Sequence, residues 1–182
     1  MQNVEFKAEL RDLPLARGIA LRLGAKALHT MWQTDTYFRL ANGRLKKRET
    51  EIDGEPLQTE YIFYHRPDSS KARVSQFNIY THTQAMDRFG TLALPVWVVV
   101  KKKRELLLHA WTRIHLDTVE RLGTFIEFES VVSGENTEKL GFTAVRSLRT
   151  AFGPVIGEPI SSSYSDLLAA EPDPVTGAEP PV

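Results

Sequence analysis

Cysteine is absent from the 182-residue chain. Disulfide bonds and cysteine-bound zinc are therefore excluded, as is common for proteins of a reducing compartment. Long apolar runs are missing too. The longest, Leu92 to Val100, contains Pro95, whereas a membrane helix needs about 20 apolar residues. The first residues form no basic and apolar leader, so we expect a cytoplasmic protein without a membrane partner.

Neither sign of charge is in excess. Lys and Arg number 23 and so do Asp and Glu, which gives a formal net charge of zero and no overall attraction to nucleic acid. Glycine-rich phosphate loops of the G-x-x-x-x-G-K-S/T or G-x-G-x-x-G type do not occur, so any phosphate would be bound by side chains. The apolar share of 42% and the charged share of 25% are ordinary. They predict one globular domain, a monomer or homodimer, with no nucleic-acid partner.

Helical spacing of apolar residues is confined to a few segments. Asp12 is the expected cap of the first. The expected helices are Leu13–Leu23, Glu135–Phe152 and Ser163–Ala169, with Thr83–Leu92 a short helix or a long connection. Pro154–Pro159 is expected to be a loop. The proline-rich end has almost nothing to bury, so we expect one domain over residues 1–169 and a disordered tail over 170–182.

Alternating polar and apolar residues occupy most of the remaining chain. In a β-strand successive side chains point to opposite faces, so Glu5 and Lys7 share a side opposite Val4 and Phe6. The expected strands are Asn3–Leu10, the second half of Ala25–Arg39, Arg44–Glu49, Thr59–Arg66, Ala72–Tyr80, Val96–Ala110 and two strands within Arg113–Glu129. Tight turns are expected at Asn42-Gly43 and Asp53-Gly54.

The polar faces of these strands are charged, often with one sign per strand. Every second residue from Arg44 to Arg48 is a cation, and three cations on one side of a solvated strand would only repel one another. In the hairpin, Asp117, Glu127 and Glu129 gather on one surface. Clustered carboxylates of this kind suit a hard divalent ion.

Each pattern has a simpler explanation on its own. The cations from Arg44 to Arg48 are typical of a solvated edge strand, Lys101 to Arg104 of a nucleic-acid patch, and Glu127 of an exposed strand face. Together these explanations do not account for the segregation of signs by strand. A closed barrel with a charged interior, and with an apolar outer face covered by helices, does account for it.

Such an interior would need an anion of high charge, bridged to the carboxylates by a divalent metal. A polyphosphate is the natural candidate. The cations that we expect inside the barrel, as the substrate-binding set, are Lys7, Arg44, Lys46, Arg48, Arg66, Arg73, Lys102, Arg104 and Arg113.

Seven pieces of the sequence, in order, resemble the CYTH superfamily of triphosphate tunnel metalloenzymes, which includes class IV adenylate cyclase and thiamine triphosphatase. They are NVEFK (Asn3–Lys7), QTDTYF (Gln33–Phe38), GRLKKRE (Gly43–Glu49), YHRPD (Tyr64–Asp68), KKRE (Lys102–Glu105), RIHLDTVERLGTFIEFE (Arg113–Glu129) and SYSDLL (Ser163–Leu168). The resemblance implies an α+β fold in which an eight-stranded antiparallel closed β-barrel, with helices packed outside, binds a triphosphate with Mg²⁺ or Mn²⁺.

The resemblance also implies roles for individual residues. Metal binding is implied for Glu5, Asp117, Glu127 and Glu129. Phosphate binding is implied for most of the cations named above, with Lys7, Lys102 and Arg104 as the expected catalytic residues. The chain departs from the family's opening E-x-E-x-K at Asn3. This neutral side chain removes a charge that a second metal ion would use.

Two chemistries occur in the family that the chain resembles. In a cyclase the ribose 3′-hydroxyl of ATP attacks the α-phosphorus and pyrophosphate leaves. In a triphosphatase water attacks the terminal phosphorus of inorganic triphosphate, thiamine triphosphate or a nucleotide. QTDTYF and GRLKKRE are most similar to the cyclase group, so cyclase activity is expected first and hydrolysis is the alternative. A protein that binds polyphosphate or a nucleotide without turnover is the third hypothesis, because of Asn3.

Overall fold

The computed structural model describes residues 1–40, 43–65, 71–90 and 94–171. Asn42 of the expected turn, Arg66 and most of the expected tail lie outside these residues. The strands are β1 Gln2–Leu10, β2 Lys26–Phe38, β3 Arg44–Ile52, β4 Glu55–Pro56, β5 Glu60–His65, β6 Arg73–Tyr80, β7 Val96–His109, β8 Thr112–Val119, β9 Gly123–Val131 and β10 Ile156–Pro159. The helices are α1 Leu13–Arg22, α2 His82–Phe89, α3 Glu138–Ala151 and α4 Tyr164–Ala170. Within the described part of the chain, no helix has the length and apolar character needed to cross a membrane.

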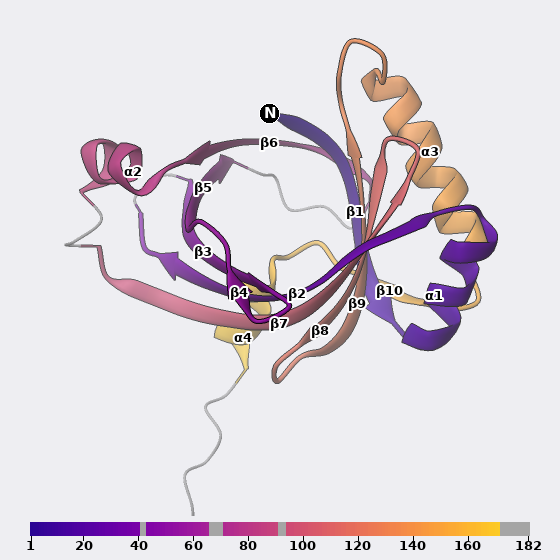
Figure 1. The fold of residues 1–182 in the computed structure, drawn as a ribbon, viewed down its shortest axis with the longest axis horizontal. Coiled ribbons are helices and arrows are strands. Elements are labelled where there is room, and N and C mark those ends of the chain that lie inside the picture. The colour runs from indigo at the N-terminus through magenta and orange to yellow at the C-terminus, as the bar shows by residue number, and fades with distance from the viewer. Residues whose placement is uncertain (41–42, 66–70, 91–93, 172–182) are drawn as a thin grey trace, which may run out of the picture.

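Eight strands close into a barrel in the order β1-β6-β5-β3-β2-β7-β8-β9, and β9 returns to β1 (Figure 1). All of these pairs are antiparallel. On one edge of β1, β6 pairs with the first half and β10 with Ala8 and Leu10 of the second half. The eight-stranded closed antiparallel barrel predicted from the sequence is confirmed.

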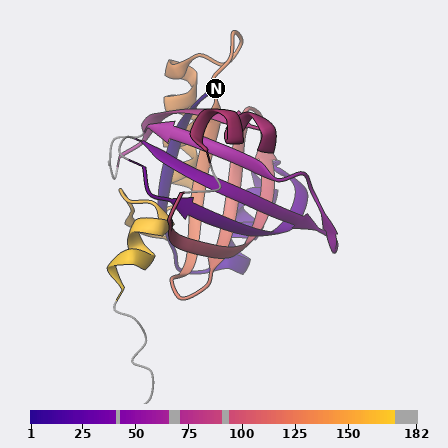
Figure 2. The ribbon, with the colours of Figure 1, turned by 90° about the vertical axis from the view of Figure 1, so that its left-hand side faces the viewer.

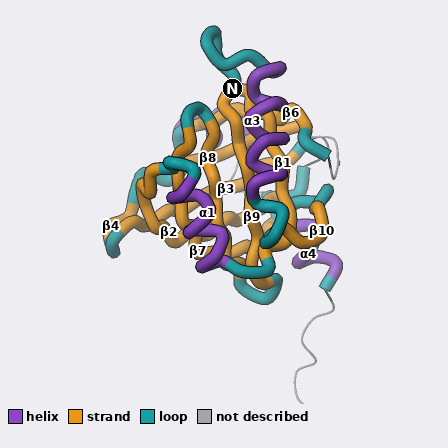
Figure 3. The backbone as a smooth tube through the Cα atoms, turned by 90° about the vertical axis from the view of Figure 1, so that its right-hand side faces the viewer, coloured by secondary structure: helices purple, strands orange, loops and turns teal. Residues whose placement is uncertain are grey.

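The largest apolar cluster lies outside the barrel, whereas a second one shares Tyr37, Tyr64 and Tyr164 with the lining of the interior. Val4, Phe6 and Ala8 of β1 face outwards and are buried, together with residues of β8 and β9, against α1 and α3. Phe128 of β9 lies at the centre of this layer, with its ring centroid 6.2 Å from that of Phe6 and 5.3 Å from that of Phe152. Figure 3 shows α1 and α3 lying over this wall of the barrel. Because the outer face takes up the apolar residues, the charged faces are left to line the interior.

A glycine in the first turn of α3 lets the helix approach the barrel closely. A Cβ atom at Gly141 would lie 3.0 Å from Val4 Cγ2 and 3.3 Å from Val4 Cβ, closer than side chains normally pack. Glycine lowers helix propensity, but here it allows α3 to lie directly on β1. The same residue that weakens the helical pattern in the sequence therefore has a packing role.

The remaining helices lie elsewhere on the barrel. α2 covers β5 and β6 on the side opposite α1 and α3 (Figure 2), where Ala85 packs with Tyr61. α4 contacts β7 and inserts Tyr164 into a cluster with Phe125 and Val119. Arg44 of β3 holds the start of α4, since its Nη1 donates to Ser163 Oγ at 2.8 Å and also reaches the carboxylate of Asp166.

Two expectations about single elements were wrong. β2 is a strand along its whole length, not only in its second half. Its first half pairs with β7 through a register shift between Ala27 and His29, which interrupts the alternation that marks a strand. Pro154–Pro159 was expected to be a loop but contains β10, a short edge strand that depends on pairing with β1 rather than on a pattern of its own.

We expect Phe128→Ala to lower the free energy of unfolding by about 3–5 kcal/mol, because it opens a cavity in the layer between barrel and helices. Trp111 is 52% exposed, so Trp111→Ala should change it by only about 0.5 kcal/mol. Urea unfolding of both variants measures the difference. Equal losses would contradict the assignment of this external layer as the core of the fold.

Candidate active site

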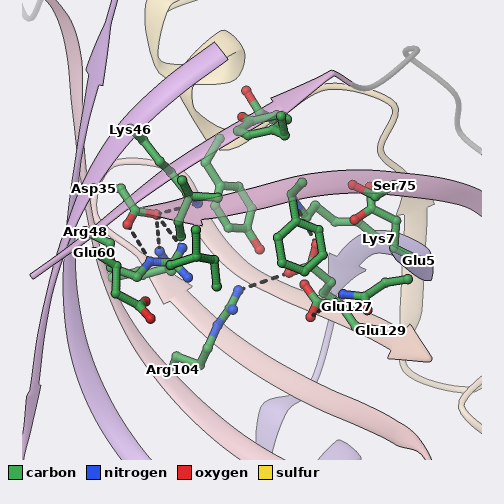
Figure 4. Close-up of a pocket in the computed structure, with 18 of the residues that line it drawn as sticks. Glu5, Lys7, Asp35, Lys46, Arg48, Glu60, Ser75, Arg104, Glu127 and Glu129 are labelled. Carbon is green, nitrogen blue, oxygen red and sulfur yellow. Dashed lines mark hydrogen bonds and ion pairs between the residues drawn. The ribbon is translucent and has the colours of Figure 1, made fainter. Parts of the chain in front are cut away.

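The barrel encloses a cavity of about 270 Å³ that is lined mainly by charged and aromatic side chains. Figure 4 shows Asp35, Lys46 and Arg48 on one side, Glu5, Glu127 and Glu129 on the other, and Arg104 between them. The full lining is Asn3, Glu5, Lys7, Asp35, Tyr37, Lys46, Arg48, Glu60, Ile62, Tyr64, Ser75, Phe77, Ile79, Lys102, Arg104, Arg113, Glu127, Glu129, Ser163 and Tyr164.

Strand register brings the acids of one wall together. β1 and β9 pair Glu5 with Glu129 and Lys7 with Glu127, so inward-facing acids and a cation become neighbours across strands. Lys7 Nζ lies 3.3 Å from Glu127 Oε1, and Arg113 Nη2 lies 3.0 Å from Glu129 Oε2. The hairpin of β8 and β9 that the sequence predicted is therefore present, and β1 completes its acidic surface.

Glu127 and Glu129 share this surface with His115. His115 Nδ1 is 3.4 Å from Glu127 Oε2 and 4.0 Å from Glu129 Oε1, and one ligand atom from each residue lies within 4.8 Å of the others. Burial alone would raise the pKa of Glu127, but Lys7, His115 and Arg104 hold that pKa well below its usual range. Ionised carboxylates beside an imidazole are donors that fit a divalent cation; the oxygens suit Mg²⁺, and Mn²⁺ also accepts the nitrogen.

The other two acids for which metal binding was predicted differ in position. Glu5 lines the cavity and accepts a hydrogen bond of 3.0 Å from Arg73 Nε. Asp117 is fully buried and is not among the lining residues. Its two oxygens accept from Arg104 Nε at 2.7 Å and Nη2 at 2.6 Å, and Tyr164 donates to it at 2.8 Å.

Asp117 thus fixes the position of Arg104 without lining the cavity itself. Burial raises the pKa of Asp117, but the Arg104 guanidinium brings that pKa below its usual value, so the pair is ionised. Arg104 Nη2 also donates to Glu127 Oε2 at 3.0 Å. A bidentate pair fixes the plane of the guanidinium, which orients Arg104 between the acidic and basic sides of the cavity. The metal role of Asp117 remains a prediction.

Asp35 is a site residue that the sequence argument did not single out, although it belongs to QTDTYF. The residue is 1% exposed, and its carboxylate accepts from Arg48 Nε and Nη2, both at 2.7 Å, from Lys102 Nζ at 2.8 Å and from Lys46 Nζ at 3.2 Å. An aspartate in the middle of a strand is disfavoured, and this was the signal available in the sequence. We call Asp35, Lys46, Arg48 and Lys102 the Asp35 cluster.

The cluster holds three cations around one carboxylate, so each cation is attracted by Asp35 and repelled by the other two. Burial lowers the pKa of Lys46 to about 7, with repulsion from Arg48 acting in the same direction. Burial likewise lowers the pKa of Lys102 to about 8. Burial would raise the pKa of Asp35, but the three cations keep it well below its usual range. The cluster therefore has an excess of positive charge that an entering anion would stabilise.

The other predicted cations are divided between the cavity and its supports. Lys7 lines the cavity, and its Nζ lies 4.2 Å from the centroid of the Tyr164 ring. Arg44 and Arg73 are not among the lining residues; Arg44 binds the start of α4, and Arg73 binds Glu5. Arg66 lies outside the described residues.

Asn3 occupies the position at which the predicted motif has an acid. It is 4% exposed and lines the cavity. With the amide oriented so that both of its groups have partners, its nitrogen donates to the Gln2 carbonyl at 2.9 Å and its oxygen accepts from Arg113 Nη2 at 3.0 Å. The amide therefore supports Arg113 and adds no charge to the acidic wall.

Comparison with protein families supports the same fold. The model of the CYTH domain family matches residues 1–154, and no curated protein matches the sequence. Among solved structures, the PH1012 protein of Pyrococcus horikoshii aligns with a TM-score of 0.70 at 21% identity, over 91% of this chain and 98% of its own.

Two further structures carry functional descriptions. An adenylate cyclase candidate from Vibrio parahaemolyticus aligns with a TM-score of 0.71 at 17% identity, over 92% of this chain and 98% of its own. A Hippeastrum protein, described as an adenylyl cyclase candidate with a dominant triphosphatase activity, aligns with a TM-score of 0.60 at 16% identity, over 91% and 94%. At these identities the likeness shows the fold alone.

The Asp35 cluster predicts an unusual dependence of stability on pH. The unfolded chain keeps Lys46 and Lys102 protonated up to about pH 10.4, whereas the folded protein releases these protons near pH 7 and 8. Because the unfolded state binds more protons in this window, the free energy of unfolding should rise between pH 7 and 9.5. Urea unfolding at a series of pH values measures the slope.

Lys46→Met should flatten this rise, because it removes one of the two groups. Lys101→Met is the matched control, since Lys101 belongs to β7 but is exposed, and it should leave the rise unchanged. A free energy of unfolding that falls from pH 7 to 9.5 in the natural protein would contradict the lowered pKa values.

Proposed function

The chain belongs to the CYTH domain family, and we propose that it is a divalent-metal-dependent enzyme acting on a triphosphate bound in the barrel, with adenylate cyclase chemistry as the first candidate. The observation that carries the proposal is the segregation of charge within one cavity. The Asp35 cluster supplies cations on one side, and Glu5, Glu127 and Glu129 supply carboxylates on the other. A triphosphate with a bound divalent cation has the complementary arrangement of charges.

The basic side is suited to bind phosphate oxygens. Arg48 and Lys102 are already held by Asp35, and Arg104 is held by Asp117, so little reorganisation is needed when an anion arrives. Fixed cations are most effective in catalysis when they lie where negative charge develops. We assign Lys102 and Arg104 to the stabilisation of that charge.

Lys7 is the third proposed catalytic residue. It lies between Glu127 and the Tyr164 ring, at the border of the acidic wall. A cation at this point can bind a phosphate oxygen that faces the carboxylates. Arg113 of β8 is bound to Glu129, two residues further along β9 and on the opposite side of β9 from Lys7.

The acidic side is suited to hold the metal. Glu127 and Glu129 are the ligands that the geometry supports best, with His115 or Glu5 beside them. A divalent ion bound there would neutralise charge on the phosphates and orient the phosphate chain. Because Asn3 contributes no charge, we propose one protein-held metal ion rather than two.

Two reactions use these residues in the same way and differ in the nucleophile. Cyclase chemistry requires the ribose 3′-hydroxyl near the α-phosphorus, and its products are cyclic AMP and pyrophosphate. Hydrolysis requires water at the terminal phosphorus. The description of the Vibrio parahaemolyticus neighbour agrees with the first, and that of the Hippeastrum neighbour favours the second as the alternative.

Product identification tests the proposal. The pure protein is incubated with ATP, inorganic triphosphate and thiamine triphosphate, each with Mg²⁺ or Mn²⁺. Cyclic AMP with pyrophosphate identifies a cyclase, and orthophosphate identifies a triphosphatase. Tight binding without any product would favour a nucleotide- or polyphosphate-binding protein and would contradict an enzymatic function.

Glu127→Gln should lower the activity by about 100-fold at saturating substrate, because a metal ligand is lost. Glu120→Gln is the control: Glu120 is exposed in the turn after β8, and its removal should leave the rate unchanged. Circular dichroism checks that both variants are folded. If Glu127→Gln does not fold, Glu129→Gln replaces it, since the Glu129 side chain is 19% exposed. An unchanged rate in the folded variant would overturn the metal assignment.

A further inference from the structure

Tyr164, the first residue of α4, contacts the supports of two of the proposed catalytic cations from inside the cavity. The residue is 4% exposed and belongs to the cavity lining. Its hydroxyl donates to Asp117 Oδ2 at 2.8 Å, and the same oxygen accepts from Arg104 Nη2 at 2.6 Å. Its ring centroid lies 4.2 Å from Lys7 Nζ. One side chain therefore contacts Lys7 directly and Arg104 through Asp117.

Lys7 and Arg104 also share an anionic partner. Glu127 Oε1 lies 3.3 Å from Lys7 Nζ, and Glu127 Oε2 accepts from Arg104 Nη2 at 3.0 Å. Figure 4 shows both cations beside this carboxylate. Glu127 is one of the proposed metal ligands, and a carboxylate that shares its charge with a metal ion attracts neighbouring cations less. The contacts of Tyr164 do not involve Glu127, so they can persist when Glu127 binds a metal ion.

The two contacts fix the cations without neutralising them. An ammonium group is attracted to the face of an aromatic ring, by about 2 kcal/mol when the pair is desolvated, but the ring carries no net charge. The positive charge of Lys7 therefore stays available to a phosphate oxygen. Burial and the charge of Asp117 raise the pKa of Tyr164 well above its usual value, so the hydroxyl stays protonated and donates to Asp117.

The segment that carries Tyr164 is tied to the same strand as Lys7. The carbonyl of Lys7 accepts from the backbone nitrogen of Ile160 at 2.9 Å, so the chain ahead of α4 is bound to the residue whose ammonium group meets the ring. Arg44 holds the start of α4. Phe125 packs against the ring with a centroid distance of 5.0 Å. The position of the ring is therefore fixed by the barrel on several sides.

We propose that Tyr164 is a positioning residue for the reaction in this cavity: its ring fixes Lys7, and its hydroxyl fixes Asp117 and with it Arg104. This inference rests on the proposed function of the same cavity. It gives α4 a role beyond packing, since the helix then determines where two cations lie relative to the phosphates. The family match covers residues 1–154 and ends before α4, so this role follows from the contacts alone.

Two substitutions separate the two contacts. Tyr164→Phe removes the hydroxyl and keeps the ring, whereas Tyr164→Leu removes both. Phe125→Leu is the matched control, because Phe125 packs against Tyr164 but is not among the lining residues; it loosens the same packing and keeps both contacts. Circular dichroism checks that the variants are folded. If Tyr164→Leu does not fold, Tyr164→Met takes its place.

The contact with Lys7 is tested by a double-mutant cycle. Calorimetry with inorganic triphosphate and Mg²⁺ gives a dissociation constant for each protein with and without Lys7→Met. Lys7→Met should weaken binding by about 30-fold in the natural protein, the loss typical of a hydrogen bond to a charged group. The loss should be the same in Tyr164→Phe and in Phe125→Leu. In Tyr164→Leu it should fall to about threefold, because Lys7 is no longer held at the site.

The contact with Asp117 is tested by kinetics on the triphosphate that the product assay identifies. Arg104 is assigned to charge that develops in the transition state, so a less firmly oriented Arg104 acts on kcat rather than on KM. Tyr164→Phe should lower kcat by about tenfold and leave KM nearly unchanged. A natural kcat in this variant would overturn the role of the hydroxyl.

The outcomes separate this inference from the function on which it rests. If the natural protein does not bind inorganic triphosphate, the proposed triphosphate site is wrong. If it binds, and Lys7→Met costs as much in Tyr164→Leu as in the natural protein, the triphosphate site stands and Tyr164 does not position Lys7. The same loss of coupling in Phe125→Leu would also overturn the inference, since the effect would then come from the packing of α4.

Discussion

Every charge buried inside the barrel must be paired, because an isolated charge in a low-dielectric interior costs several kcal/mol. This constraint determines the layout of the cavity. Arg104 is paired with Asp117, Lys7 with Glu127, Arg113 with Glu129, and three cations share Asp35. Strand register makes most of these pairs possible, because residues opposite one another in an antiparallel pair lie within reach on the same face.

The fold allows this interior by placing its largest apolar cluster on the outside. α1 and α3 cover the outward faces of β1, β8 and β9, and the charged residues share the interior with the cluster that includes Tyr37, Tyr64 and Tyr164. The pairing is uneven in one respect. The Asp35 cluster has more positive than negative charge, so it is the place where an additional anion would be most favourable. α4 contributes to the same interior, since Tyr164 contacts both Asp117 and Lys7.

Much of the fold could be predicted from the sequence because strand alternation is local. Lys46 and Arg48 share a face in any extended strand, and segregation of charge by strand leads to a charged barrel interior. β10 could not be predicted, because it is a strand only through its pairing with β1. The irregular first half of β2 was missed for a similar reason, since the register shift near His29 hides the alternation.

The lining of the cavity was predictable only in part, since Asp117, Arg44 and Arg73 do not line it, and the pairing of its charges was not predictable. The charge pattern indicated Glu127, Lys102 and Arg104, and all three line the cavity. The sequence could not show that Arg104 forms an ion pair with Asp117. This pair depends on the pairing of β7 with β8 and on a tyrosine from α4. The role of Asp35 was equally inaccessible, because its three cations come from β3 and β7.

The central claim is that the interior of the barrel is organised to bind a triphosphate together with a divalent metal. The most direct test is the free energy of unfolding measured against increasing inorganic triphosphate, with Mg²⁺ and with chelator, and with orthophosphate at matched ionic strength. The account predicts stabilisation that grows with triphosphate concentration, reaching about 2.7 kcal/mol at 100 times the dissociation constant, and that is strongest with Mg²⁺. Absence of stabilisation, or an equal effect of orthophosphate, would contradict it.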